Sequence, residues 1–281
     1  ERNTAFESRI ANFIKSIEDI YPFLQGLNLE IHSDNSFPHS AGIASSASAM
    51  SALALCLCSI ERQVFGSLTA EDEFLQKASY LSRLASGSAC RSVYPKLGQW
   101  GDHEKIQGST NSFAIDVSDA VDPIFHTFKN SILIASAKEK SVSSSAGHQL
   151  MENNPYAAVR FKQAKDNLAK LMSAMKEGDI DVFIQIVEEE ALTLHALMMT
   201  STPSYVLMKP NSLVLIEKIR AFREKTGLPV CFTLDAGPNL HVLYPEYIAT
   251  QMQVFIKEEC QLYCENGLII EDEVGEGAHK L

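Results

Sequence analysis

Hydrophobic positions along the chain follow two spacings, one typical of helices and the other of strands. Apolar side chains at steps of three and four residues over 1–24 predict an amphipathic helix. The same spacing and helix-start signals predict further helices at 69–84, 153–176, 181–199, 212–225 and 246–264. Alternating or continuous apolar runs predict strands at 27–32, 112–117, 131–137, 228–234 and 240–244. The glycine-containing end, 275–278, is predicted to be a closing loop.

The stretch 35–60 contains no charged residue and is predicted to be a loop that becomes a helix. Pro38, Gly42 and the run Ser45-Ser46-Ala47 occupy the loop, where small residues let backbone N–H groups approach an anion at the helix start. The apolar surface from residue 50 onward predicts a buried helix. The serines could instead cap and pack a core helix. A membrane span is rejected, because the apolar part is about half of the ~20 residues that a span needs.

A second loop of small residues, Ser86-Gly87-Ser88-Ala89-Cys90-Arg91-Ser92, follows the helix predicted at 69–84. It could be a simple helix cap with a surface arginine. Two hydroxyl groups on a glycine hinge, followed by an arginine fork, also suit an oxyanion or a carboxylate. The segment 94–108, with the only tryptophan, is predicted to be a long exposed loop.

The apolar strand predicted at 228–234 ends in Asp235-Ala236-Gly237-Pro238-Asn239. This is a natural turn sequence, and it could be purely structural. In the functional interpretation the strand directs one carboxylate, that of Asp235, at a site. His195 lies in an apolar helix, where a histidine is more often part of the core than of a site.

Composition restricts the class of protein. The chain has 281 residues, 46% of them hydrophobic, enough for one or two domains with a large core. A net charge of −11 with dispersed Lys and Arg argues against a nucleic-acid partner. The six cysteines form no Cys-x-x-Cys pair and suggest reduced, buried thiols of an intracellular protein, here expected to be cytoplasmic. No zinc spacing and no signal peptide are visible, and no protein metal site is predicted.

The spacing Pro38, Gly42, Ser45, Ser46, Ala47 resembles the central phosphate-binding motif of the GHMP small-molecule kinases. The segments 86–92 and 233–239 closely resemble two signature segments of the diphosphomevalonate decarboxylase family within that superfamily, and Ser144 with Gly147 matches a third. The resemblance implies an α+β, two-domain GHMP kinase fold with the active site in the interdomain cleft. The domains are expected at 1–128, the ATP-binding domain, and at 129–281. A homodimer is also implied.

For the site, the resemblance implies ATP-dependent decarboxylation of a phosphorylated mevalonate. Asp235 would orient or deprotonate the tertiary alcohol, and Arg91 would hold the carboxylate. Substrate oxygens would be bound by Ser86, Ser88 and Ser144, and His195 would also bind the substrate. The ATP phosphates, with Mg²⁺, would lie on the backbone of Gly42, Ala44, Ser45 and Ser46.

Three departures from the family pattern are visible. Its N-terminal Ala-x-Ile-Ala-x-x-Lys-Tyr-Trp-Gly-Lys segment is absent, so we expect a segment, including the first strands of the domain, to precede Glu1. Pro95-Lys96 replaces the usual Gly-Gly, and Ser145 replaces an arginine of some members. Two alternatives therefore stay open: a related kinase that phosphorylates mevalonate or its monophosphate without decarboxylation, and a non-catalytic binding protein.

Overall fold

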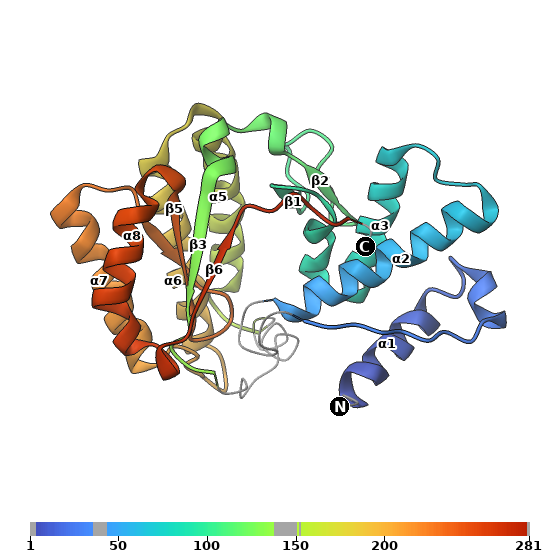
Figure 1. Ribbon diagram of the computed structural model, residues 1–281, viewed down its shortest axis with the longest axis horizontal. Helices are drawn as coiled ribbons and strands as arrows, with labels where there is room; N and C mark the ends of the chain where they lie inside the picture. The colour runs from blue at the N-terminus through green and yellow to red at the C-terminus, as the bar shows by residue number, and fades with distance from the viewer. Residues whose placement is uncertain (1–3, 36–43, 138–150, 152, 280–281) are drawn as a thin grey trace.

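The computed structural model describes residues 4–35, 44–137, 151 and 153–279, and it shows two halves side by side (Figure 1). The N-terminal half consists mainly of helices with a small two-stranded sheet. The C-terminal half is a four-stranded antiparallel sheet covered by helices. The fold is therefore the α+β mixture that the sequence predicts.

Three helices form the core of the N-terminal half. They are α1 (Thr4–Ser16), α2 (Ser45–Phe65) and α3 (Glu71–Ala85), with the 3-10 turns η1 (Pro22–Gly26) and η2 (Gly87–Val93). The strands β1 (Gly98–Trp100) and β2 (Ala114–Asp116) pair antiparallel beside them. The predicted apolar face of α1 packs inward, since Phe13 is only 5% exposed, and Ile17 just beyond its end is fully buried. Helix propensity alone would not hold so short a helix, so this packing supplies its stability.

The larger sheet has the strand order β4-β5-β3-β6. Its strands are β3 (Phe128–Leu133), β4 (Cys231–Thr233), β5 (Leu240–Pro245) and β6 (Ile269–Glu273). Its helices are α5 (Ala157–Glu177), α6 (Ile180–Met199), α7 (Pro210–Thr226) and α8 (Ala249–Phe255). Alternating side chains enter two cores: Phe232 packs with residues of α7 and α8, whereas Cys231 packs with residues of α5 and α6.

The C-terminal segment returns to the N-terminal half, as Figure 1 shows where the end of the chain lies beside α3. The Lys96 N–H donates to the Gly275 carbonyl at 2.9 Å. Gly277 has a φ of +86°, and a Cβ there would lie 3.1 Å from Pro95. The predicted closing loop thus packs on the turn that follows η2. Lys96 has a φ of +55°, a left-handed conformation that favours the glycine of the family pattern.

Several details of the sequence prediction are wrong, among them the helix predicted over 1–24, which ends at Ser16. Segment 27–32 is not a strand, because no described strand pairs with it, and Leu27, Leu29 and Ile31 are exposed. Helix α2 is only half-buried, and its Cys56 is exposed, whereas the other five cysteines are buried. The segment 94–108 is not wholly an exposed loop, because it contains β1. The helix predicted over 246–264 changes after α8 into π and 3-10 turns.

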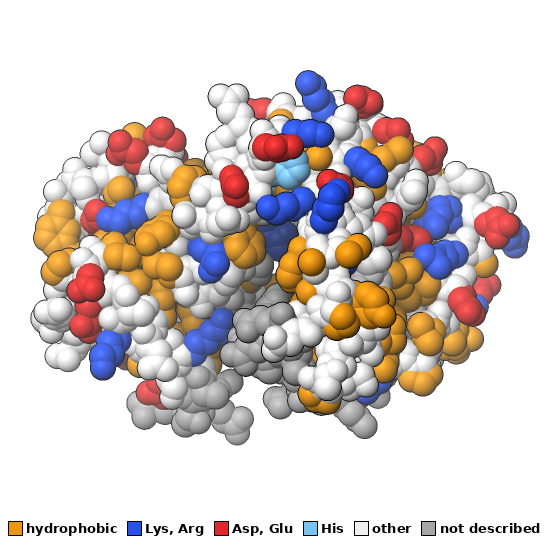
Figure 2. Space-filling view, turned by 180° about the vertical axis from the view of Figure 1, so that it is seen from behind, with side chains coloured by type: hydrophobic (Ala, Val, Ile, Leu, Met, Phe, Trp, Pro, Cys, Tyr) orange, Lys and Arg blue, Asp and Glu red, His pale blue; other side chains and the backbone are white. Residues whose placement is uncertain are grey.

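Acidic and basic side chains lie interspersed on the face shown in Figure 2, with apolar side chains between them. This agrees with the dispersed Lys and Arg of the sequence. Among the helices in the described part of the chain, none combines the length and the apolar character that crossing a membrane requires.

A polar cluster in the N-terminal half yields the first testable prediction. The Glu61 carboxylate, 14% exposed, lies 2.7 Å from the Lys77 ammonium and accepts from the Ser67 hydroxyl at 2.9 Å. Burial disfavours the charged carboxylate, but hydrogen bonds from Lys77, Tyr21 and Ser67 together lower its pKa below the ordinary 4.5. A carboxyl group with a depressed folded-state pKa stabilises the protein above its unfolded pKa, and this stabilisation is lost as pH falls through the folded value.

Glu61→Gln is therefore expected to lower the free energy of unfolding at pH 7 by about 1.5 kcal/mol, a typical value for hydrogen bonds to a charged group. The difference from the wild type should shrink as pH falls below about 4.5. Urea unfolding followed between pH 3 and pH 7 measures it. Glu71→Gln is the control, since that carboxylate is 67% exposed and paired with Arg62, and it should change stability by less than about 0.5 kcal/mol. A pH-independent loss in Glu61→Gln would contradict the assignment.

Candidate active site

The start of α2 has the geometry of an anion site. Ala44, its N-cap, has φ 57° and ψ 28°, and no side chain caps the helix. The carbonyl of Ala44 accepts from the N–H groups of Ala47 and Ser48, at 2.8 and 3.3 Å. A left-handed alanine costs roughly 1–2 kcal/mol, and such strain is concentrated at functional sites. Ser45 and Ser46, in the first turn, are half-buried. Gly42, also predicted to contact phosphate, lies outside the described residues.

The second predicted loop forms η2 and its flanking residue Ser86. Ala89 and Cys90 point into the core, while the Arg91 side chain is exposed and Ser86 and Ser88 are half-buried. Ala89 packs in one cluster with Ala47 and Met50 of α2. The structure therefore brings together the two small-residue loops that the sequence singled out.

An aromatic residue that the prediction placed in an exposed loop packs against this turn. A Cβ on Gly87 would lie 3.6 Å from the Trp100 ring. The Arg83 guanidinium lies over the same ring, 4.8 Å from its centroid. The position of the only tryptophan between two glycines was a signal for close packing. Trp100, with the Arg83 guanidinium over its ring, thus packs against one side of the turn.

The turn after β4 exposes one carboxylate on a rigid backbone. The Asp235 side chain is exposed, but its carbonyl accepts from His195 Nε2 at 3.1 Å and from the Gly237 N–H at 2.7 Å. The Asn239 amide oxygen accepts from the Ser136 N–H at 3.0 Å. His195 is 1% exposed, so the structure places its imidazole beneath the turn rather than on the surface. Its role in substrate binding stays a prediction.

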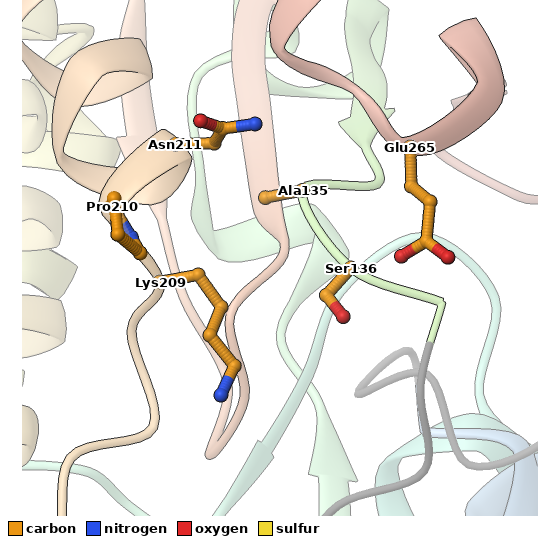
Figure 3. A pocket seen from close by; sticks show the side chains of 6 residues that line it. All are labelled: Ala135, Ser136, Lys209, Pro210, Asn211 and Glu265. Atoms are coloured by element: carbon orange, nitrogen blue, oxygen red, sulfur yellow. The ribbon is translucent and has the colours of Figure 1, made fainter.

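A pocket of about 520 Å³ adjoins this turn (Figure 3). Lys209 and Asn211 line it from the start of α7, Ser136 from the segment that follows β3, and Glu265 from the opposite side. Glu265 accepts from the Ala137 N–H at 2.7 Å, and Lys209 makes no ion pair with any described residue. Ser136 also contacts the turn through Asn239. The pocket therefore places one ammonium group and one carboxylate near the Asn239 end of this turn.

The two parts of the predicted site lie on different halves of the molecule. Figure 1 shows the start of α2 at the inner end of the N-terminal half, on the side that faces the four-stranded sheet. Within the described residues no hydrogen bond or ion pair joins Arg91 to Asp235, so their convergence on one ligand stays a prediction. Ser144 lies outside the described residues. No group of three or more His, Cys, Asp or Glu suited to a metal ion occurs among the residues that the structure describes.

Two family models match this chain. That of the diphosphomevalonate decarboxylase-like N-terminal domain matches residues 1–114, and that of the mevalonate 5-diphosphate decarboxylase C-terminal domain matches 131–272. The chain is 31% identical over 241 residues to the diphosphomevalonate decarboxylase of Gibberella zeae, covering 83% of this chain and 59% of that protein. It spans about three fifths of the length of the curated relatives it matches. The predicted division at residue 128 stays a prediction.

Solved structures show the same similarity. The mevalonate diphosphate decarboxylase of Staphylococcus aureus matches with a TM-score of 0.76 and 26% identity, over 96% of this chain and 76% of that chain. MDDEF in complex with MVAPP, AMPPCP and magnesium matches with a TM-score of 0.78 and 25% identity, over the same shares of the two chains.

Proposed function

Because the chain belongs to the diphosphomevalonate decarboxylase family, we propose that it catalyses the ATP-dependent decarboxylation of mevalonate 5-diphosphate to isopentenyl diphosphate. The observation that carries the proposal is the family match over both halves. The uncapped helix start beside the Ser86–Ser92 turn and the rigidly held Asp235 turn support it. The complex of a relative with MVAPP, AMPPCP and magnesium supports ATP, Mg²⁺ and a phosphorylated substrate.

In the proposed reaction, the tertiary hydroxyl of the substrate attacks the γ-phosphate of ATP. Asp235 orients this hydroxyl and accepts its proton. The backbone N–H groups of Ala44, Ser45 and Ser46, together with Gly42, hold the phosphates of ATP, which arrives with Mg²⁺. A helix start with no side-chain cap fits such an anion. ADP leaves, and the substrate then carries a phosphate on its tertiary carbon.

The second step breaks a carbon–carbon bond. Arg91 holds the substrate carboxylate through its planar fork, so that this bond is aligned with the leaving phosphate. The carboxylate departs as carbon dioxide, and its bonding pair forms the double bond as inorganic phosphate leaves. Ser86, Ser88 and Ser144 bind substrate oxygens, and His195 supports the Asp235 turn. The departing phosphate is the electron sink, so the step needs no organic cofactor.

A coupled assay of carbon dioxide and ADP, run with mevalonate 5-diphosphate and separately with the monophosphate, tests the proposal. Equal amounts of both products from the diphosphate are expected. ADP alone would instead indicate a kinase without decarboxylation. Neither product, with ligand binding retained, would indicate a non-catalytic binding protein.

We also infer a homodimer in the cytoplasm. Family resemblance supports the dimer, and six cysteines without a disulfide, five of them buried, support a reducing compartment. Sedimentation at micromolar concentration should give a mass of twice the monomer.

A further inference from the structure

The peptide unit next to Arg91 is anchored from inside the N-terminal core. The Ser79 hydroxyl donates to the Cys90 carbonyl at 2.9 Å. That carbonyl belongs to the same planar peptide unit as the Arg91 nitrogen, so this hydrogen bond fixes the direction in which the chain enters Arg91. Ser79 is 0% exposed, whereas the Arg91 side chain is exposed. The buried Ser79 hydroxyl therefore fixes the position of the backbone from which the exposed Arg91 side chain extends.

The same hydroxyl also connects the turn to the small sheet. Its oxygen accepts from the Ala114 N–H of β2 at 2.9 Å, so one side chain joins α3, η2 and β2. The partner strand β1 lies against the other side of the turn, since a Cβ on Gly98 would be 3.0 Å from the Arg91 carbonyl oxygen. The Arg91 backbone is thus enclosed between α3 and the strand pair.

We propose that Ser79 is a positioning residue for Arg91, acting through the Cys90 carbonyl and β2. The inference rests on the proposed function, in which Arg91 holds the substrate carboxylate. Removal of the hydroxyl leaves a buried carbonyl and a buried N–H without their partner, and such groups are costly unless the backbone shifts. A displacement of about 1 Å in a positioned group can lower a rate 10²-fold.

Ser79→Ala tests the proposal against a closely matched control. Ser82 lies on the same helix and is also 0% exposed, but its hydroxyl donates to the Ala78 carbonyl within α3, at 2.7 Å. Ser79→Ala is expected to lower kcat/KM by about 10- to 100-fold, and Ser82→Ala by less than about twofold. Both are assayed at a temperature at which circular dichroism shows them folded. Equal activities in the two variants would overturn the proposal.

Two further readouts separate positioning from a general loss of packing. Affinity for mevalonate 5-diphosphate should fall in Ser79→Ala, whereas affinity for isopentenyl diphosphate, which lacks the carboxylate, should not. In an Arg91→Gln background, Ser79→Ala should lower kcat/KM by less than about twofold, because the guanidinium group that Ser79 positions is already absent. If Ser79→Ala lowered kcat/KM in that background by as much as it does in the wild type, the proposed role of Ser79 would be overturned. An Arg91→Gln variant of normal activity would instead overturn the proposed role of Arg91 itself.

A crystal structure of Ser79→Ala provides a readout besides activity. The Arg91 backbone should be displaced relative to the wild type, and it should stay in place in Ser82→Ala. An unmoved Arg91 in Ser79→Ala would contradict the proposal.

Discussion

Asp235→Asn is expected to lower kcat by about 10²- to 10⁴-fold, the usual contribution of a positioned general base. The amide has nearly the same shape as the carboxylate, but it cannot accept the proton of the tertiary hydroxyl. Folding should be little affected, because the side chain is exposed and the turn is held through its backbone and through Asn239. Steady-state release of ADP and carbon dioxide, together with thermal unfolding, measures both effects.

Asp272→Asn is the matched control for this variant. Asp272 is an exposed acidic residue of the same half, on β6, and it contributes to no proposed site. Its activity should equal that of the wild type, and both variants should differ from the wild type by less than about 0.5 kcal/mol in stability. Unchanged turnover in Asp235→Asn would remove Asp235 from the mechanism.

Arg91→Gln is expected to lower kcat/KM by about 30- to 5,000-fold, because truncation of one partner of a buried, hydrogen-bonded charge pair costs about 2–5 kcal/mol. Arg91→Lys keeps the charge but loses the planar fork, so it should recover only part of the activity. Comparison of KM with kcat shows whether the substrate carboxylate is held in the ground state or mainly in the transition state.

Arg9→Gln is the control for this pair of variants. Arg9 is another exposed arginine of the N-terminal half, and its guanidinium donates to the Ala85 carbonyl at 3.3 Å. It should retain full activity. If Arg91→Lys were as active as the wild type, a point charge would suffice, and the bidentate contact would be wrong.

Long periodic segments were predicted well from the sequence. Helices α5, α6 and α7 begin and end within a few residues of their predicted bounds, because each presents an apolar stripe along several turns. Strands were less predictable. The run 27–32 alternates as a strand should, yet it has no partner among the described residues, while the exposed edge strand β6 was not predicted at all. Strand pairing joins residues that are far apart in the chain, so no local sequence pattern predicts which strands will pair.

The candidate site, like the fold, could be predicted from the sequence only in part. The residue types of both small-residue loops and of the Asp235 turn were visible, because glycine, proline and serine are required locally where backbone must approach a ligand. Ser79, Trp100 and Arg83 were not singled out. Each acts through a contact with η2 or its neighbours, and such a contact arises only in the tertiary structure.

The sequence by itself determined which segments carry the chemistry, since turn residues and helix starts follow from short-range backbone geometry. It also determined the family, through those same segments. The tertiary structure alone decided that Ala89 packs in one cluster with Met50, and that the Asp235 turn is held by Ser136, which follows β3, and by His195 of α6. Each of these contacts depends on how distant helices and strands bury their apolar faces together, and that arrangement is a property of the whole packed core rather than of any one stretch of chain.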